Sequence, residues 1–251
     1  MHGDGAGPHL ADLQQENARL RGEVDSLHEA LTRGDEALAT SEIRLKLAYL
    51  ATIQALVRAI EAKDPYTVGH SAMVAKVAVA VSRQLGMTES ERERVRIAAT
   101  LMNIGKIGVP KEVLTKEGAL DQTERTVLEK HVAFGAQIVE PVIYPWDIAT
   151  LVYQSHERLD GTGYPEGVKG DDIDFDARII GLCDTFVAMT ADRVHRKAHD
   201  EEEVLRFFYG EVGKTFDEAC VAALAQVLKG DEELRVALEH FKTTTLRSIE
   251  D

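Results

Sequence analysis

The sequence is poor in cysteine and has no excess of positive charge. Its two cysteines, Cys183 and Cys220, form no Cys-x-x-Cys pair in 251 residues, so we expect buried free thiols in a reducing cytosol. Lys and Arg number 29 against 43 Asp and Glu, which gives a formal net charge of −14. This balance disfavours both a nucleic-acid-binding surface and docking on anionic lipid. It leaves room for a phosphodiester held by a metal or by a few local arginines.

Long apolar runs are also missing. No stretch approaches the roughly 20 apolar residues that cross a bilayer, and the N-terminus lacks the apolar core of a signal peptide. The sequence therefore predicts a soluble, cytoplasmic protein. Apolar residues still make up 44% of the chain, which is enough for one core and an appendage.

Near the N-terminus, apolar residues recur every seven positions. One seam consists of Leu10, Asn17, Val24, Leu31, Leu38 and Leu45, and the complementary seam begins with Leu13, Leu20 and Leu27. This repeat predicts a coiled coil, and the asparagine in the seam favours a parallel homodimer because two buried amides can pair across the axis. A lone solvated helix is the alternative.

The remaining chain shows helical spacing and no sustained period-two alternation. Thr88 and Asp121 each precede a glutamate by three residues, which is the pattern of a capping box at a helix start. The predicted fold class is all-α, a helical bundle preceded by a coiled-coil helix. The predicted boundaries are a disordered N-terminus at 1–8, the coiled-coil helix at 9–45, the helical domain at 46–230, and a C-terminal helix and tail at 231–251.

The densest group of chemically active residues lies at 156–165, in the sequence His-Glu-Arg-Leu-Asp-Gly-Thr-Gly-Tyr-Pro. Gly161 and Gly163 can adopt positive φ and can let the backbone approach a ligand closely. Pro165 stiffens the end of the stretch. By itself the stretch reads equally well as a surface turn.

These residues resemble the signature of HD-GYP domains, a branch of the HD metal-dependent phosphohydrolase superfamily. Further similar blocks follow the family's order at 63–71, 104–110, 130–131 and 184–190, so the resemblance covers roughly 63–228. It implies an HD-superfamily helical bundle and a function connected with cyclic di-GMP or a related cyclic dinucleotide.

The resemblance also implies a metal site, of which this chain keeps only part. The ligand positions that it keeps are His70, His131, His156 and Asp184, and those that it replaces are Met102, Asn103 and Ser155. A thioether poorly replaces imidazole for borderline dications, and a neutral amide cannot bridge two cations as a carboxylate does. We therefore expect no resident cofactor, or at most one weakly bound divalent cation, either iron, manganese, nickel or zinc.

Other positions carry implied roles. Lys106 matches the family's lysine that assists the phosphate or leaving group, a role that is vestigial if no metal is bound. The residues expected to bind a ligand or a partner are Asp160, Gly161, Thr162, Gly163, Tyr164, Pro165, Arg193 and Arg196. Asp184 follows apolar residues on a helix, so its carboxylate needs a cation, Lys106 or a histidine as its partner.

Two functions fit the sequence, and the incomplete ligand set favours the first. The first is a catalytically inactive or strongly impaired signalling module that dimerises and binds a cyclic dinucleotide or a partner protein, such as a GGDEF-type cyclase, at its Gly-Tyr-Pro loop. The alternative is a phosphodiesterase that hydrolyses cyclic di-GMP with metal-activated water. A purely structural dimer with an empty pocket is a third possibility.

Overall fold

The structure is a computed structural model that describes residues 7–63, 68–116, 118–191 and 197–250. The chain forms two compact units, Met1–Thr52 and Ile53–Asp251. None of the helices in the described ranges is long and apolar enough to cross a membrane.

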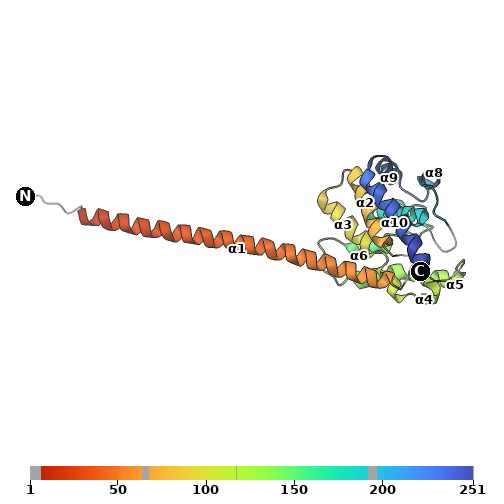
Figure 1. Cartoon of the computed structure of the whole chain (residues 1–251), viewed down its shortest axis with the longest axis horizontal. Coiled ribbons are helices and arrows are strands. Elements are labelled where there is room, and N and C mark those ends of the chain that lie inside the picture. Colours follow the sequence, from red (N-terminus) through yellow and green to blue (C-terminus); the bar gives the residue numbers. More distant parts are fainter. Residues whose placement is uncertain (1–6, 64–67, 117, 192–196, 251) are drawn as a thin grey trace, which may run out of the picture. The chain divides into compact units, whose positions relative to one another are not determined.

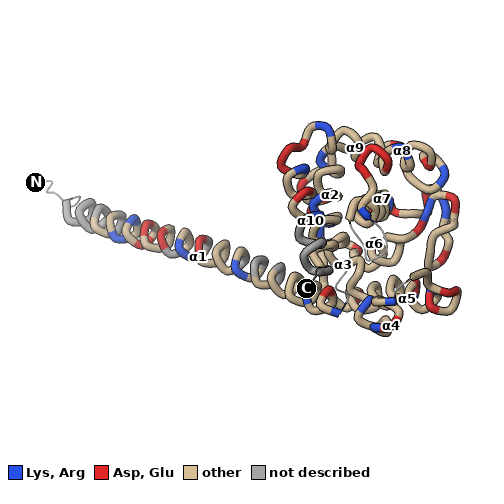
Figure 2. Tube along the Cα trace, turned by 45° about the vertical axis from the view of Figure 1, so that its right-hand side comes forward, with Lys and Arg blue, Asp and Glu red and all other residues tan. Residues whose placement is uncertain are grey.

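Helix α1 (Gly7–Glu61) makes up the described part of the first unit and continues as one 55-residue helix into the second (Figure 1). The apolar seam residues Leu20, Val24, Leu27, Leu31, Leu38 and Leu45 are between 47 and 72% exposed. Basic and acidic residues are interspersed along the helix (Figure 2). The coiled coil remains a prediction, and the side chains of Leu10, Leu13 and Asn17 lie outside the described residues.

The second unit consists of short helices and loops. Its elements are the end of α1, α2 (His70–Gln84), α3 (Glu89–Leu101), η2 (Ile104–Gly108), α4 (Lys111–Leu114), α5 (Gln122–Val139), α6 (Ile148–Gln154), η3 (Gly170–Asp172), α7 (Phe175–Thr190), α8 (Glu201–Glu211), α9 (Glu218–Gly230) and α10 (Glu232–Glu250). The described residues contain no β-strand, only an isolated bridge between Val212 and Phe216. The all-α prediction is confirmed.

Both predicted capping boxes are present. The Thr88 hydroxyl accepts the Glu91 amide at 3.3 Å, and the Glu91 carboxylate accepts the Thr88 amide at 2.7 Å. Asp121 and Glu124 exchange the same pair of hydrogen bonds at 2.9 and 2.8 Å. These reciprocal bonds satisfy amides that helices α3 and α5 leave unpaired, and so they fix where both helices begin.

Helix α2 lies at the centre of the second unit, beside α3, α7 and α9. Its residues Val74, Val77 and Val81 are fully buried at helical spacing, so one face of α2 forms the middle of the core. Cys183 and Cys220 are buried and free as predicted, and burial raises the pKa of both thiols.

The C-terminal helix packs on the core of the second unit. Helix α10 has 19 residues and packs against α2 and α9. Its buried residues Leu234, Leu238 and Phe241 recur at spacings of four and three, which explains why the helix lies on the core.

Candidate functional site

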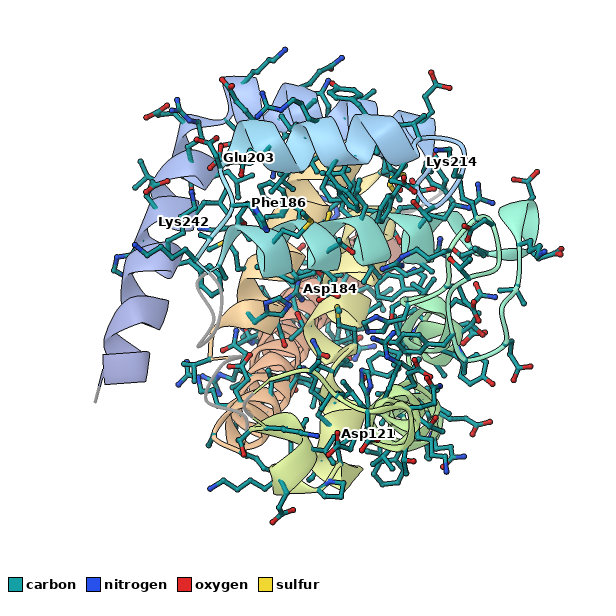
Figure 3. All side chains as sticks on the ribbon, turned by 90° about the vertical axis from the view of Figure 1, so that its right-hand side faces the viewer. Asp121, Asp184, Phe186, Glu203, Lys214 and Lys242 are labelled. Atoms are coloured by element: carbon teal, nitrogen blue, oxygen red, sulfur yellow. The ribbon has the colours of Figure 1, made fainter. Side chains whose placement is uncertain are left out.

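His70 and Asp184 form the centre of the candidate site. His70 is the first residue of α2 and is 6% exposed, and its Nε2 donates to Asp184 Oδ1 at 2.8 Å. Asp184 leaves α7 on the side opposite Phe186, which points toward α8 (Figure 3). The expectation that the Asp184 carboxylate needs a cationic or histidine partner is met by His70.

The charge of Asp184 is stabilised from several sides. Burial would raise the pKa of this carboxyl, but the His70 hydrogen bond and the positive charge of Lys106 lower the pKa below its usual range. Asp184 is therefore ionised at neutral pH. Lys106, on η2, also lowers the pKa values of the two histidines described next, so it lies within electrostatic reach of all three groups.

A second cluster consists of His131, His156 and Tyr164. The His131 and His156 rings meet edge to face with centroids 5.3 Å apart, and the Tyr164 ring stacks on His156 at 4.9 Å with an interplanar angle of 9°. Burial lowers the pKa of His131 to about 4 and that of His156 to about 3. Both imidazoles are therefore neutral at pH 7, and burial raises the pKa of the stacked Tyr164 phenol.

The histidine cluster contains two nitrogen atoms suited to a metal. His131 Nδ1 lies 2.6 Å from the Leu128 carbonyl oxygen, which can only accept, so Nδ1 carries the proton and Nε2 keeps its lone pair. Such a carbonyl bond on the other ring nitrogen is usual for metal-ligating histidines. Among the described residues, Nε2 of His131 and Nε2 of His156 are buried without a hydrogen-bond partner.

The replaced ligand positions have become parts of the core. Met102 is fully buried, and Asn103 is 8% exposed. Ser155 is fully buried and donates from its hydroxyl to the Val152 carbonyl at 2.8 Å. No group of three or more His, Cys, Asp or Glu side chains able to hold a metal ion occurs in the described part of the chain. The residues present therefore do not fit a two-metal centre.

The signature loop at 156–167 is held in shape largely by its own residues. Glu157 is 5% exposed, and its Oε1 accepts the amides of Glu166 and Gly167 at 2.8 and 3.1 Å. Asp160 Oδ1 accepts the Thr162 amide at 2.9 Å and the Thr162 hydroxyl at 2.7 Å. Asp160 and Thr162 thus shape the turn, and their predicted part in binding remains a prediction.

The two glycines of the loop act differently. Gly161 has a φ of 78°, as the sequence allowed, whereas Gly163 lies outside the positive-φ region. A Cβ atom on Gly163 would lie 2.5 Å from the Arg158 amide nitrogen, the Glu157 Cα and the His156 carbonyl oxygen. Gly163 thus makes a close approach to the chain's own backbone, and its predicted approach to a ligand remains a prediction.

Arg158 is a neighbour of the site that sequence reasoning missed. Its Nη1 donates to the Glu157 carbonyl at 2.8 Å, its Nη2 donates to the Thr185 hydroxyl at 3.2 Å, and its guanidinium carbon lies 5.2 Å from the Phe216 ring centroid. These contacts join the signature loop to α7, next to Asp184. The signal was present as the third residue of the signature. Arg193 and Arg196, the predicted basic pair, lie outside the described residues.

A helical unit that joins a largely buried His–Asp pair to two further histidines is the arrangement expected of an HD-type domain. A family model described as "HD domain" matches residues 54–220, so the chain belongs to the HD domain family. The prediction of a domain of the HD superfamily and of HD-GYP type is confirmed.

Known proteins similar to this chain include phosphodiesterases that act on cyclic dinucleotides. The 3'3'-cGAMP-specific phosphodiesterase 3 of Vibrio cholerae is 38% identical over 76% of this chain and 42% of its own length. The cyclic di-GMP phosphodiesterase response regulator RpfG of Xanthomonas campestris is 31% identical over 91% of this chain and 60% of its own length. The chain thus spans less than two thirds of either relative.

A solved structure supports the fold. An HDG"Y"P protein from Bdellovibrio bacteriovorus superposes with a TM-score of 0.51 at 18% identity, over 64% of this chain and 52% of that protein.

Proposed function

We propose that this chain is a signalling domain that binds a cyclic dinucleotide and hydrolyses it weakly or not at all. The observation that carries this proposal is the state of the two ligand positions next to Lys106. Met102 is closed into the core, and Asn103 supplies a neutral amide where a bridging carboxylate is needed. Hydrolysis of a phosphodiester by this family's route depends on cations that neutralise phosphate oxygens and lower the pKa of water.

Binding is supported by the similarity to cyclic dinucleotide phosphodiesterases and by the groups that survive. Lys106 and Arg158 place two cationic side chains near the partly buried Asp184, with Tyr164 and His156 as flat neighbours. Cationic groups can contact phosphate oxygens, and flat rings can stack on purine bases. The two capacities together match a cyclic purine dinucleotide.

The second candidate is a metal-dependent cyclic dinucleotide phosphodiesterase, and the names of the relatives favour it over an inactive domain. The chain's own support for it is the pair of unpartnered Nε2 atoms, which belong to His131 and His156 among the described residues, close to ionised Asp184. One divalent cation held by the Nε2 atoms of His131 and His156 would supply charge neutralisation to a bound phosphate. His131 and His156 would contribute neutral imidazoles, and the stacked Tyr164 would keep water from one face of His156.

The proposal includes two protein contacts that rest on the sequence. The exposed seam of α1 would pair with a second copy of the chain in a parallel coiled coil. The signature loop, which exposes Asp160 and Thr162, would bind a protein partner such as a GGDEF-type cyclase. The rigid hydrogen bonding inside the loop suits it to present a fixed surface.

Purified full-length chain would decide between the candidates. Metal content would be measured by mass spectrometry, binding of cyclic di-GMP and cyclic GMP-AMP by calorimetry, and turnover by chromatography with added manganese or anaerobic ferrous iron. The proposal predicts saturable binding without accumulation of linear dinucleotide. A metal content of about two per chain together with linear product would establish the phosphodiesterase instead. Absence of both binding and turnover would overturn both candidates.

A further inference from the structure

The last turn of α1 holds the segment that presents His70. Glu61, the final residue of α1, is 7% exposed, and its Oε2 accepts the Gly69 amide at 3.0 Å while its Oε1 accepts the Ser71 amide at 3.4 Å. These amides flank His70 at the start of α2. Gly69 itself offers no side-chain cap in the described structure. The Glu61 carboxylate, from another helix, therefore caps the start of α2, where the helix dipole favours a negative charge.

Two residues later, Lys63 holds the segment that presents Lys106. Its Nζ donates to the Ile107 carbonyl at 2.8 Å and to the Val109 carbonyl at 2.6 Å. Ile107 belongs to η2, directly after Lys106, and Val109 follows the end of η2. Carbonyl oxygens at a helix end favour a positive charge, so Lys63 suits this end of η2 as Glu61 suits the start of α2.

The two segments meet the end of α1 around a small shared cavity. Its lining includes Ile60 and Glu61 from α1, Ser71 from α2, and Asn103 and Lys106 at η2. Glu61 thus faces both the segment that carries His70 and the position where a neutral amide replaces the expected carboxylate. A displacement of the last turn of α1 would act on both segments at once.

We propose that Glu61 and Lys63 are positioning residues, which set His70 and Lys106 against Asp184, so that the end of α1 controls the geometry of the site. This inference rests on the proposed function for its consequence, the affinity for a cyclic dinucleotide. Its structural part concerns hydrogen bonds alone and can be tested without any ligand.

The test uses the full chain with Glu61→Gln, Glu61→Asp and Lys63→Met. Gln keeps the shape of Glu and can accept from one amide, whereas Asp is shorter by one methylene. Lys63→Arg retains donors on a long side chain and serves as the conservative variant. Matched controls are Glu233→Gln and Lys229→Met, which change exposed residues on α10 and α9.

Hydrogen exchange read by mass spectrometry would report on each segment separately. Glu61→Gln and Glu61→Asp should speed exchange of the Gly69 and Ser71 amides by about tenfold or more, because Gln loses the charge and Asp is too short to reach both amides. Lys63→Met should speed exchange at 106–109 and leave 69–71 unchanged, and Lys63→Arg should restore the wild-type rate. The exchange half-life of the His70 ring C–H should change in the Glu61 variants and stay constant in both controls.

Two results would overturn the inference: unchanged exchange at both segments, or uniformly faster exchange in every helix, which would mean general destabilisation. If the pattern holds, calorimetry with cyclic di-GMP tests its consequence, with affinity expected to fall about tenfold in Glu61→Gln and Lys63→Met. If wild-type chain binds no cyclic dinucleotide, the proposed function fails while the exchange pattern still decides whether Glu61 and Lys63 position the site.

Discussion

His131 and His156 meet edge to face at 5.3 Å between ring centroids, and the described structure pairs neither of their buried Nε2 atoms with a hydrogen-bond donor. Leaving a buried polar atom unpaired costs about 1–3 kcal/mol, so a bound species that pairs with these two nitrogen atoms would stabilise the folded state.

The unpaired nitrogens predict weak binding of a single cation. Added Mn²⁺, Ni²⁺ or Zn²⁺ should raise the unfolding temperature of the wild-type chain, since a ligand that binds only the folded state stabilises it. His131→Ala and His156→Ala should each abolish the rise. His199→Ala, at an exposed pair with Glu203, is the matched control and should keep it. An equal rise in all four proteins would show that the metal binds elsewhere.

Restoring the replaced ligands should restore metal binding. The triple variant Met102→His, Asn103→Asp, Ser155→His should bind divalent metal more tightly than wild type, as measured by calorimetry. Without metal it should be less stable, because two fully buried positions receive polar rings at a cost of about 1–3 kcal/mol each. Asn103→Asp alone, which adds only the carboxylate, is the control. A folded triple variant that takes up no metal would show that the positions were matched to the family wrongly.

The ion pair between Arg94 on α3 and Asp176 on α7 should contribute strongly to the stability of the second unit. Arg94 Nε donates to Asp176 Oδ2 at 2.7 Å, and the Asp176 side chain is only 2% exposed. Arg94→Met leaves that carboxylate buried and unpaired and should cost about 3 kcal/mol in urea unfolding. Arg235→Met, in the exposed pair with Glu232, should cost less than about 1 kcal/mol.

The same variant has a defined pH dependence. Burial raises the pKa of Asp176, and Arg94 opposes that shift. Removing Arg94 should raise the folded-state pKa further above the unfolded value, so the folded state binds the proton more tightly. The variant should therefore be destabilised at neutral pH and above. Its stability should approach that of the wild type as the pH falls through the raised pKa of Asp176. A loss that does not change between pH 7 and pH 4.5 would contradict this explanation.

Gly163 should tolerate no side chain. Gly163→Ala places a Cβ within 2.5 Å of three backbone atoms of the signature loop and should cost about 1–3 kcal/mol. It should also separate Tyr164 from His156 and weaken binding of a cyclic dinucleotide. Gly210→Ala, where no described atom lies within 4 Å of the new Cβ, should leave stability equal or slightly higher because alanine favours the helix. If the signature loop of Gly163→Ala is cleaved by protease at the same rate as that of the wild type, this role of Gly163 is refuted.

The seam of α1 predicts a dimer that charge can dissolve. Val24→Glu with Leu31→Glu introduces four like charges into the apolar seam of a paired coil and should convert a dimer into a monomer in light-scattering measurements. Glu36→Lys, off the seam and exposed, should leave the dimer intact. A wild-type chain that is already monomeric at micromolar concentration would contradict the coiled coil.

The fold was largely predictable because its signals are local. The capping boxes at Thr88 and Asp121 and the apolar spacing of α2 depend on residues within one or two turns. The partner of Asp184 was also predictable in kind, since a buried carboxylate demands one. The contacts of Lys63 were not predictable, because a lysine at a helix end resembles a solvated helix terminus and its carbonyl partners lie 44 and 46 positions further along the chain.

The parallel contact between Tyr164 and His156 gives the protein a built-in optical reporter. A phenol lying flat on a neutral imidazole in a chiral, water-poor setting should contribute a distinct tyrosine band to the near-ultraviolet circular dichroism. The chain has six tyrosines and one tryptophan, so the band can be assigned by comparison with Tyr164→Phe. A small molecule that binds between the two rings would weaken that band. Its binding could therefore be detected without a label and before its chemical identity is known.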